Sequence, residues 1–145
     1  MRCERHIEDN NLDGTIPTEL DQLTSLEILE LEEGNLHGTI PSQLGNLSNL
    51  RILDLDVNDL TGTIPEEIYS ISTLQQLDLN SNILTGTISS KIGNLVDLRL
   101  LQLHENFLTG TIPVEVGLAT QLSKCRKALR SSYFINILSR NCLKQ

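Results

Sequence analysis

The sequence predicts an α/β solenoid, a short coil of about five turns with 24 residues in each. Asn58, Asn82 and Asn106 recur at this interval, with no insertion or deletion between them. Leucines keep the same period in three columns, which are Leu26, Leu50, Leu74, Leu98 and Leu122; Leu29, Leu53, Leu77 and Leu101; and Leu31, Leu55, Leu79 and Leu103. A fixed period of this length is typical of solenoids, in which each unit buries its apolar face against its neighbours.

Each 24-residue unit, or coil, contains one predicted strand. The segment Leu53-Asp54-Leu55-Asp56 alternates apolar and polar residues, so its leucines should point inward and its aspartates outward. Strands of successive coils run in the same direction and predict a parallel sheet with a strand spacing of ~4.8 Å. Asn58 ends the strand. Because an inward amide can bond the backbone groups of the bend, we expect a buried asparagine ladder.

The rest of each coil leads the chain back along the opposite side. Gly62 suits a bend that a side chain would crowd, and Pro65 fixes the next stretch as extended. Three further apolar residues are expected to point inward, namely Ile68, Ile71 and Leu74. Each large aliphatic side chain contributes roughly 1.5–3 kcal/mol when it is fully buried, so we interpret these positions as structural. Gly34 stands where the ladder Asn belongs, and we expect an interruption there.

Charge is distributed unevenly along the chain. The formal net charge is −8, and all 19 acidic residues lie at or before Glu115. The basic residues after that point are Lys124, Arg126, Lys127, Arg130, Arg140 and Lys144. An acidic body repels phosphates and argues against nucleic acid as a partner. The basic tail could contact a membrane, an acidic partner or the body itself.

Cysteine usage and hydropathy say little about the compartment. Cys3, Cys125 and Cys142 are an odd number without zinc or CxxC spacing, and whether Cys125 pairs with Cys142 stays open. No apolar run is long enough to predict a membrane span. Met1 is followed by charged residues rather than by a hydrophobic signal core, so with Met1 as the start we expect no secretory signal.

The pattern L-x-L-x-x-N-x-L-x-G-x-I-P, read from Leu53 to Pro65 and in its copies, resembles the plant-type leucine-rich repeat. The resemblance covers roughly Ile7 to Leu122. It implies a right-handed solenoid with the parallel sheet on its concave side and a second short strand around each Gly-Thr-Ile-Pro segment. It also implies an extracellular or cell-surface protein, without catalysis of its own, that binds peptides, proteins or glycans.

Two departures from the family pattern stand out. Only Cys3 precedes the first Asn, so the paired cysteines of the usual N-terminal cap are absent, and Ser89 replaces the Pro of the fourth copy. We expect residues 1–122 to form the solenoid and residues 123–145 to form a basic, non-repeat tail. A cap on the last coil, a membrane-surface or partner helix and a disordered end are the interpretations of that tail.

The outward strand positions are the candidate binding residues, because packing does not dictate them. Aligned at the 24-residue step, they form the columns His6, Glu30, Asp54, Asp78, Gln102; Glu8, Glu32, Asp56, Asn80, His104; and Asp9, Glu33, Val57, Ser81, Glu105. Carboxylates on adjacent strands repel, and a bound cation or basic ligand would relieve this repulsion. The predicted site on the concave face comprises Glu30, Glu32, Glu33, Asp54, Asp56, Asp78, Asn80, Gln102 and His104.

Together with the family resemblance, which implies the receptor or co-receptor ectodomain type, these residues predict a non-enzymatic recognition module. Its partner would be a protein or peptide with a basic surface, and the chain a monomer or weak dimer. An inhibitor of a hydrolytic enzyme and a degenerate fragment without a partner are the alternative functions.

The candidate residues also allow solubilising, calcium-binding and catalytic interpretations. The carboxylates could be solubilising residues, or Glu32, Asp54 and Asp56 could hold calcium, although carboxylates alone rarely form a tight cage. We therefore predict no metal and no cofactor. His104 beside Glu105 lacks a nucleophile, so no catalytic residue is predicted. Asn46 begins the single N-glycosylation sequon, on the convex side.

Overall fold

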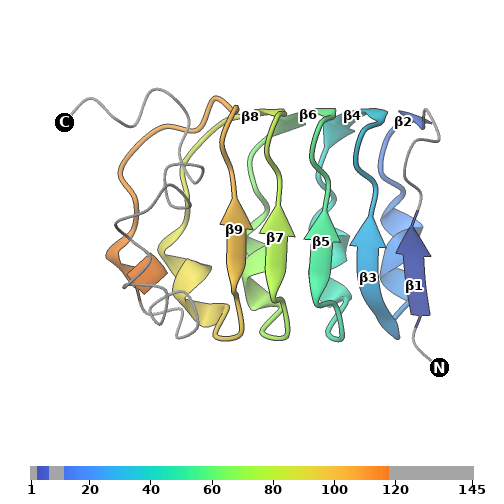
Figure 1. Ribbon diagram of the computed structural model, residues 1–145, viewed down its shortest axis with the longest axis horizontal. Helices are drawn as coiled ribbons and strands as arrows, with labels where there is room; N and C mark the ends of the chain where they lie inside the picture. Colours follow the sequence, from blue (N-terminus) through green and yellow to red (C-terminus); the bar gives the residue numbers. More distant parts are fainter. Residues whose placement is uncertain (1–2, 7–11, 118–145) are drawn as a thin grey trace.

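Two parallel sheets run along the repeat (Figure 1). This computed structural model describes residues 3–6 and 12–117, with the backbone alone for 3–6. In that part of the chain, the first sheet has the order β1 (Cys3–His6), β3 (Leu26–Glu30), β5 (Ile52–Asp54), β7 (Gln76–Asp78) and β9 (Leu100–Gln102). The second sheet has the order β2 (Asp13–Gly14), β4 (Asn35–Thr39), β6 (Asp59–Gly62) and β8 (Ile83–Leu84).

Short 3-10 helices carry the chain back along the side opposite the first sheet (Figure 1). They are η1 (Thr18–Gln22), η2 (Ser42–Asn46), η3 (Glu66–Ser70), η4 (Ser90–Asn94) and η5 (Val114–Gly117). The first four each begin directly after an extended residue, which is Pro17, Pro41, Pro65 or Ser89. At Ser89 the side chain accepts a hydrogen bond from the Lys91 amide, so the loss of the Pro leaves the helix intact.

The strand register confirms the predicted columns. Leu29 pairs with Leu53, Leu53 with Leu77 and Leu77 with Leu101, each at the same position of the neighbouring coil. The predicted inward residues of the coil around residue 60 are all at most 5% exposed; they are Leu53, Leu55, Leu60, Ile64, Ile68, Ile71 and Leu74. The core is therefore a continuous aliphatic spine, as the period predicts.

The predicted asparagine ladder is also confirmed. Asn82 accepts a hydrogen bond from the Leu60 amide (3.0 Å) and donates to the Leu55 carbonyl (2.9 Å), both in the preceding coil. Asn58 and Asn106 make the corresponding bonds. Each amide thus satisfies buried backbone groups and joins two coils. The expected interruption at Gly34 concerns bonds to the preceding coil, and residues 7–11 of that coil lie outside the described residues.

The second strand exists and overlaps the predicted Gly-Thr-Ile-Pro segment only at its start: β4 includes Gly38 and Thr39, whereas β8 ends at Leu84, before Gly86. β6 ends at Gly62, before Thr63, Ile64 and Pro65. Gly62 has a φ of 78°, a conformation that turns the chain out of the sheet and is open to glycine without strain. In β4, β6 and β8 the strand therefore begins directly after the ladder position and ends within two residues of the glycine.

Three further predictions concern the C-terminal tail, membrane spans and the glycosylation sequon. Residues 118–145, which include the predicted basic tail with Cys125 and Cys142, lie outside the described residues. Within the described ranges, no helix has the length and apolarity that a bilayer crossing needs. Asn46 lies exposed at the end of η2, and its amide donates a hydrogen bond to Asp21 (3.2 Å).

Candidate functional site

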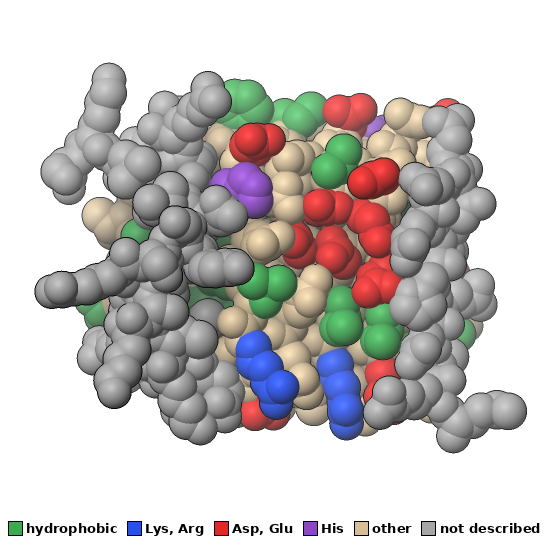
Figure 2. Space-filling model, in the orientation of Figure 1, with side chains coloured by type: hydrophobic (Ala, Val, Ile, Leu, Met, Phe, Trp, Pro, Cys, Tyr) green, Lys and Arg blue, Asp and Glu red, His purple; other side chains and the backbone are tan. Residues whose placement is uncertain are grey.

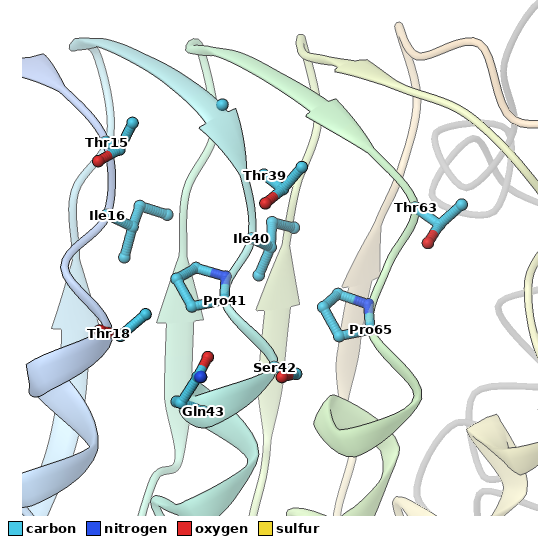
Figure 3. A pocket seen from close by; sticks show the side chains of 11 residues that line it. Thr15, Ile16, Thr18, Thr39, Ile40, Pro41, Ser42, Gln43, Thr63 and Pro65 are labelled. Carbon is cyan, nitrogen blue, oxygen red and sulfur yellow. The ribbon is translucent and has the colours of Figure 1, made fainter.

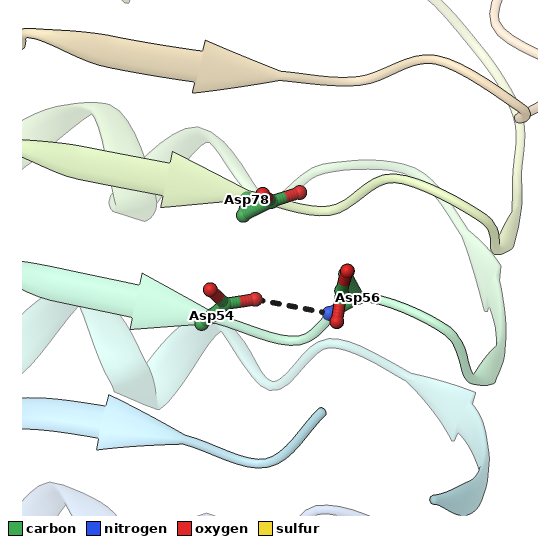
Figure 4. Close-up of side chains that lie close together, drawn as sticks. All are labelled: Asp54, Asp56 and Asp78. Carbon is green, nitrogen blue, oxygen red and sulfur yellow. Dashed lines mark hydrogen bonds between the residues drawn. The ribbon is translucent and has the colours of Figure 1, made fainter. Parts of the chain in front are cut away.

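Acidic side chains gather on the outward surface of the first sheet, which we call the strand face (Figure 2). Asp54 ends β5, Asp78 ends β7, and Asp56 follows β5 by two residues. Carboxylate oxygens of these three residues all lie within 4.8 Å of one another (Figure 4). We call Asp54, Asp56 and Asp78 the acidic cluster.

Hydrogen bonds fix the carboxylates of the acidic cluster in place. Asp54 accepts from the Asp56 amide (3.3 Å, Figure 4) and from the Gln76 side chain (3.0 Å). Asp78 accepts from the amide nitrogen of Asn80 (3.1 Å) and from the side chains of Asn80 and Gln102. The Asn80 side chain also donates to Asp56 (3.1 Å). The cluster is therefore held by neutral donors, and no ion pair to it is found in the described part of the chain.

Burial changes the acidity of the cluster. The Asp78 side chain is only 4% exposed, and Asp54 and Asp56 are half-buried. Burial, and then the neighbouring charge of Asp78, raise the pKa of Asp54 from 3.8 to about 7. Burial is also the main cause of a raised pKa at Asp56. A positive charge placed beside these groups would favour their ionised forms and lower both pKa values.

The structure brings together five of the residues predicted for the site. Asp54, Asp56, Asp78, Asn80 and Gln102 form one hydrogen-bonded group. The tight carboxylate group contains Asp78 and not Glu32, which differs from the set considered for calcium.

The remaining predicted residues lie around this group. Glu30 pairs with Asp54 at the end of β3, and the charge of Glu32 is one cause of the raised pKa of Asp54. His104 is half-buried, with a buried Nδ1 that has no hydrogen-bond partner in the described part of the chain.

The prediction that Glu33 is an outward strand residue was wrong. Glu33, Val57, Ser81 and Glu105 have φ values of 52°, 50°, 51° and 53°, in the left-handed region. At this position the chain leaves the strand face and bends toward the second sheet. The sequence carried no sign of this bend, because the four residues at this position share no side-chain type.

Two kinds of residue at the site were missed from the sequence. Gln76 binds Asp54 from the neighbouring strand, and it lies two residues before Asp78 on the same face. The two-residue period of a strand therefore contains the signal for Gln76. Ile83 and Phe107 were missed as well; both are apolar and exposed just beyond the strand face.

A shallow groove lies on the other side of the coil, along β4 and η2 (Figure 3). Its volume is about 670 Å³, and it is lined by Thr15, Ile16, Thr18, Gly38, Thr39, Ile40, Pro41, Ser42, Gln43, Thr63 and Pro65. The lining contains no charged side chain. Its threonine methyl groups pack on glycines of the next coil, as Thr39 does on Gly62. The groove is therefore separate in place and in chemistry from the acidic cluster.

The fold, the in-register leucines and the asparagine ladder define a leucine-rich-repeat solenoid. Residues 24–84 match the leucine-rich-repeat family model, and the chain is similar in structure to the ectodomains of plant receptor kinases. A comparison with curated proteins gave no match.

Three solved structures illustrate the similarity. The ectodomain of the Arabidopsis thaliana receptor kinase GASSHO1/SCHENGEN3, in complex with CASPARIAN STRIP INTEGRITY FACTOR 2, is 39% identical, with a TM-score of 0.80 over 81% of this chain and 14% of that chain. The plant peptide hormone receptor RGFR1 in complex with RGF2 is 40% identical, with a TM-score of 0.76 over 77% of this chain and 18% of that chain. The Arabidopsis thaliana BIR2 ectodomain is 36% identical, with a TM-score of 0.74 over 76% of this chain and 58% of that chain. This chain thus spans less than two thirds of each of these proteins.

Proposed function

We propose that this chain is a recognition module whose strand face binds a protein or peptide that presents basic side chains. The observation that carries this proposal is the acidic cluster, with oxygens of three aspartates within 4.8 Å of one another and no ion pair to a lysine or arginine in the described part of the chain. Recognition, rather than catalysis, is the role that this arrangement supports.

The electrostatics of the cluster favour a cationic ligand. Two full charges at such a separation repel by about 3 kcal/mol at an effective dielectric constant of 20. An arginine or lysine side chain that reaches the cluster would turn this repulsion into attraction. Because Gln76, Asn80 and Gln102 already hold the carboxylates, the ligand would not have to order them.

The solved relatives support a protein or peptide as the partner. The structures of RGFR1 and GASSHO1/SCHENGEN3 are complexes with RGF2 and CASPARIAN STRIP INTEGRITY FACTOR 2, respectively. Their similarity also supports an extracellular or cell-surface location for this chain. Asn46 is exposed and would be the acceptor of a glycan there.

A titration with a short peptide of alternating arginine and serine tests the proposed function. Calorimetry should show binding to the wild-type chain at low salt, and Asp54→Asn with Asp78→Asn should weaken it at least tenfold. Asparagine keeps the size of the side chain, and its oxygen can still accept from the backbone amide of Asp56 or Asn80. Its NH2 group can donate to the amide oxygen of Gln76 or Gln102 once that side chain flips, so the strand face stays folded.

The matched control removes two negative charges elsewhere. Glu66 and Glu67 are exposed on η3, where Glu66 forms an exposed ion pair with Lys91 (3.1 Å) and accepts an exposed hydrogen bond from the Ser89 hydroxyl (3.1 Å). Glu66→Gln with Glu67→Gln should leave the affinity nearly unchanged, because exposed ion pairs contribute little. Equal weakening in both double variants would mean that net charge, and not the acidic cluster, attracts the peptide, and would contradict the proposal.

A further inference from the structure

Three large apolar side chains are exposed along the edge where the chain leaves the strand face. Val57 is 45% exposed, Ile83 41% and Phe107 60%. We call these three residues the apolar rim. Ile83 and Phe107 occupy the same position in adjacent coils, and the Phe107 amide donates to the carbonyl of Leu84 (2.8 Å). Figure 2 shows hydrophobic side chains along this edge of the face, next to acidic ones.

The fold does not require apolar residues at the rim. The positions equivalent to Ile83 and Phe107 in two earlier coils hold Asn35 and Asp59, both exposed. The inward apolar residues of the same coils are buried, so the core is complete without the rim. The three side chains therefore expose apolar surface to water without a gain in packing.

Val57 is unfavourable for a second reason. Its φ is 50°, in the left-handed region, where a β-branched side chain is strained. The equivalent positions hold Glu33, Ser81 and Glu105, none of which is β-branched. A residue that is both strained and exposed weakens the folded state, and such residues cluster at functional sites.

The surroundings of the rim are acidic. Asp56 directly precedes Val57, and Glu105 lies two residues before Phe107. The lysine and arginine side chains in the described part of the chain lie elsewhere: Arg51 and Arg99 precede β5 and β9 at the opposite ends of the strands, and Lys91 lies in η4. Figure 2 shows the Arg and Lys side chains at the far edge of this face. Charge complementarity thus selects a partner that is cationic next to the rim.

We propose that the apolar rim is an anchor site for a peptide segment that carries a large apolar side chain a few residues from an arginine or lysine. This inference rests on the proposed function, because the acidic cluster binds the cationic part of the segment. Val57 lies three positions after Asp54, a step of ~10 Å at 3.3 Å per extended residue. An extended ligand therefore places its apolar side chain about three residues from the cation.

Two peptides and two pairs of variants test the anchor site. The first peptide alternates arginine and serine, and in the second one serine becomes phenylalanine. The second peptide should bind the wild-type chain roughly tenfold more tightly, the effect of one good anchor residue. Ile83→Asn with Phe107→Asn, which copies Asn35 of an earlier coil, should remove this advantage and leave the affinity for the first peptide unchanged.

The control pair is Val96→Asn with Val114→Asn, which removes two exposed apolar residues away from the rim. This pair should keep the full preference for the phenylalanine peptide. Equal affinity of the wild-type chain for the two peptides would overturn the anchor site and leave the proposed function standing. Failure of both peptides to bind would overturn the proposed function and this inference with it. A dimer of the free chain that Phe107→Asn dissociates in sedimentation would assign the rim to a second copy and also overturn it.

Discussion

At the scale of the residue, the strand face differs from a merely solubilising surface. Asp78 is only 4% exposed and accepts a hydrogen bond from the Gln102 side chain. The Gln76 side chain donates to the neighbouring carboxylate of Asp54. Solubilising residues extend into water, whereas these carboxylates are partly withdrawn from it. The cost of this burial appears at Asp54 as a raised pKa.

The pH dependence of stability reports the burial of Asp54. Its pKa rises from 3.8 to about 7 on folding, so the folded chain binds this proton more tightly than the unfolded chain does. The resulting stabilisation is complete below about pH 4 and is lost as the pH rises through about 7. In urea denaturation, Asp54→Asn should therefore flatten the fall of the unfolding free energy across this window. An unaltered pH dependence in Asp54→Asn, with Glu19→Gln as the exposed control, would contradict the burial of this carboxyl.

Val57 offers a second test at a single residue. Replacing it by Asn, which tolerates the left-handed region better, should raise the unfolding free energy by about 1 kcal/mol. Glu33 has the same backbone conformation as Val57 but is not β-branched, so Glu33→Asn should raise the unfolding free energy by less. A loss of stability in Val57→Asn would show that the side chain packs favourably in the free chain and has no need of a partner.

At the scale of the element, each coil is joined to the next by two devices besides the sheets. The asparagine ladder bonds the bend after each strand of the first sheet to the preceding coil. At the end of the second sheet, a threonine methyl group packs on the glycine of the next coil, as Thr63 does on Gly86. The glycine thus serves both the positive φ and the close approach.

Two glycines that both have a positive φ separate these roles. A Cβ at Gly86 would lie 2.8 Å from the Thr63 methyl group, whereas at Gly14 nothing lies within 4 Å. Their φ values are 83° and 115°. Gly14→Ala should cost about 1–2 kcal/mol of unfolding free energy for the backbone alone. Gly86→Ala should cost clearly more in the same denaturation experiment; equal costs would mean that the contact between the coils is slack.

At the scale of the whole molecule, the period of the sequence predicted the columns, the core and the ladder, because each follows from one repeated pattern of inward residues. The acidic cluster was predicted as neighbouring columns, since parallel strands in register bring Asp54 and Asp78 together. Its burial was not predictable, because it depends on the amides of Gln76 and Gln102 that lie over it. The left-handed bend at Glu33 was missed for a different reason. The residues found at that position are as different as Glu, Val and Ser, so residue type gave no signal for the bend.

The two sides of the solenoid also differ in charge. The strand face holds the acidic cluster and the apolar rim, while the groove along β4 and η2 is uncharged. A cationic partner should therefore approach one side only. The central claim is that this side is the strand face.

The most direct test is a backbone NMR titration of the isotope-labelled chain with the peptide of alternating arginine and serine. The claim predicts that amide shifts concentrate at residues 54–56 and 78–80, while residues 39–43 of the groove and the helix η3 stay unchanged. Shifts that centre on the groove or on η3, with the strand face unaffected, would contradict it.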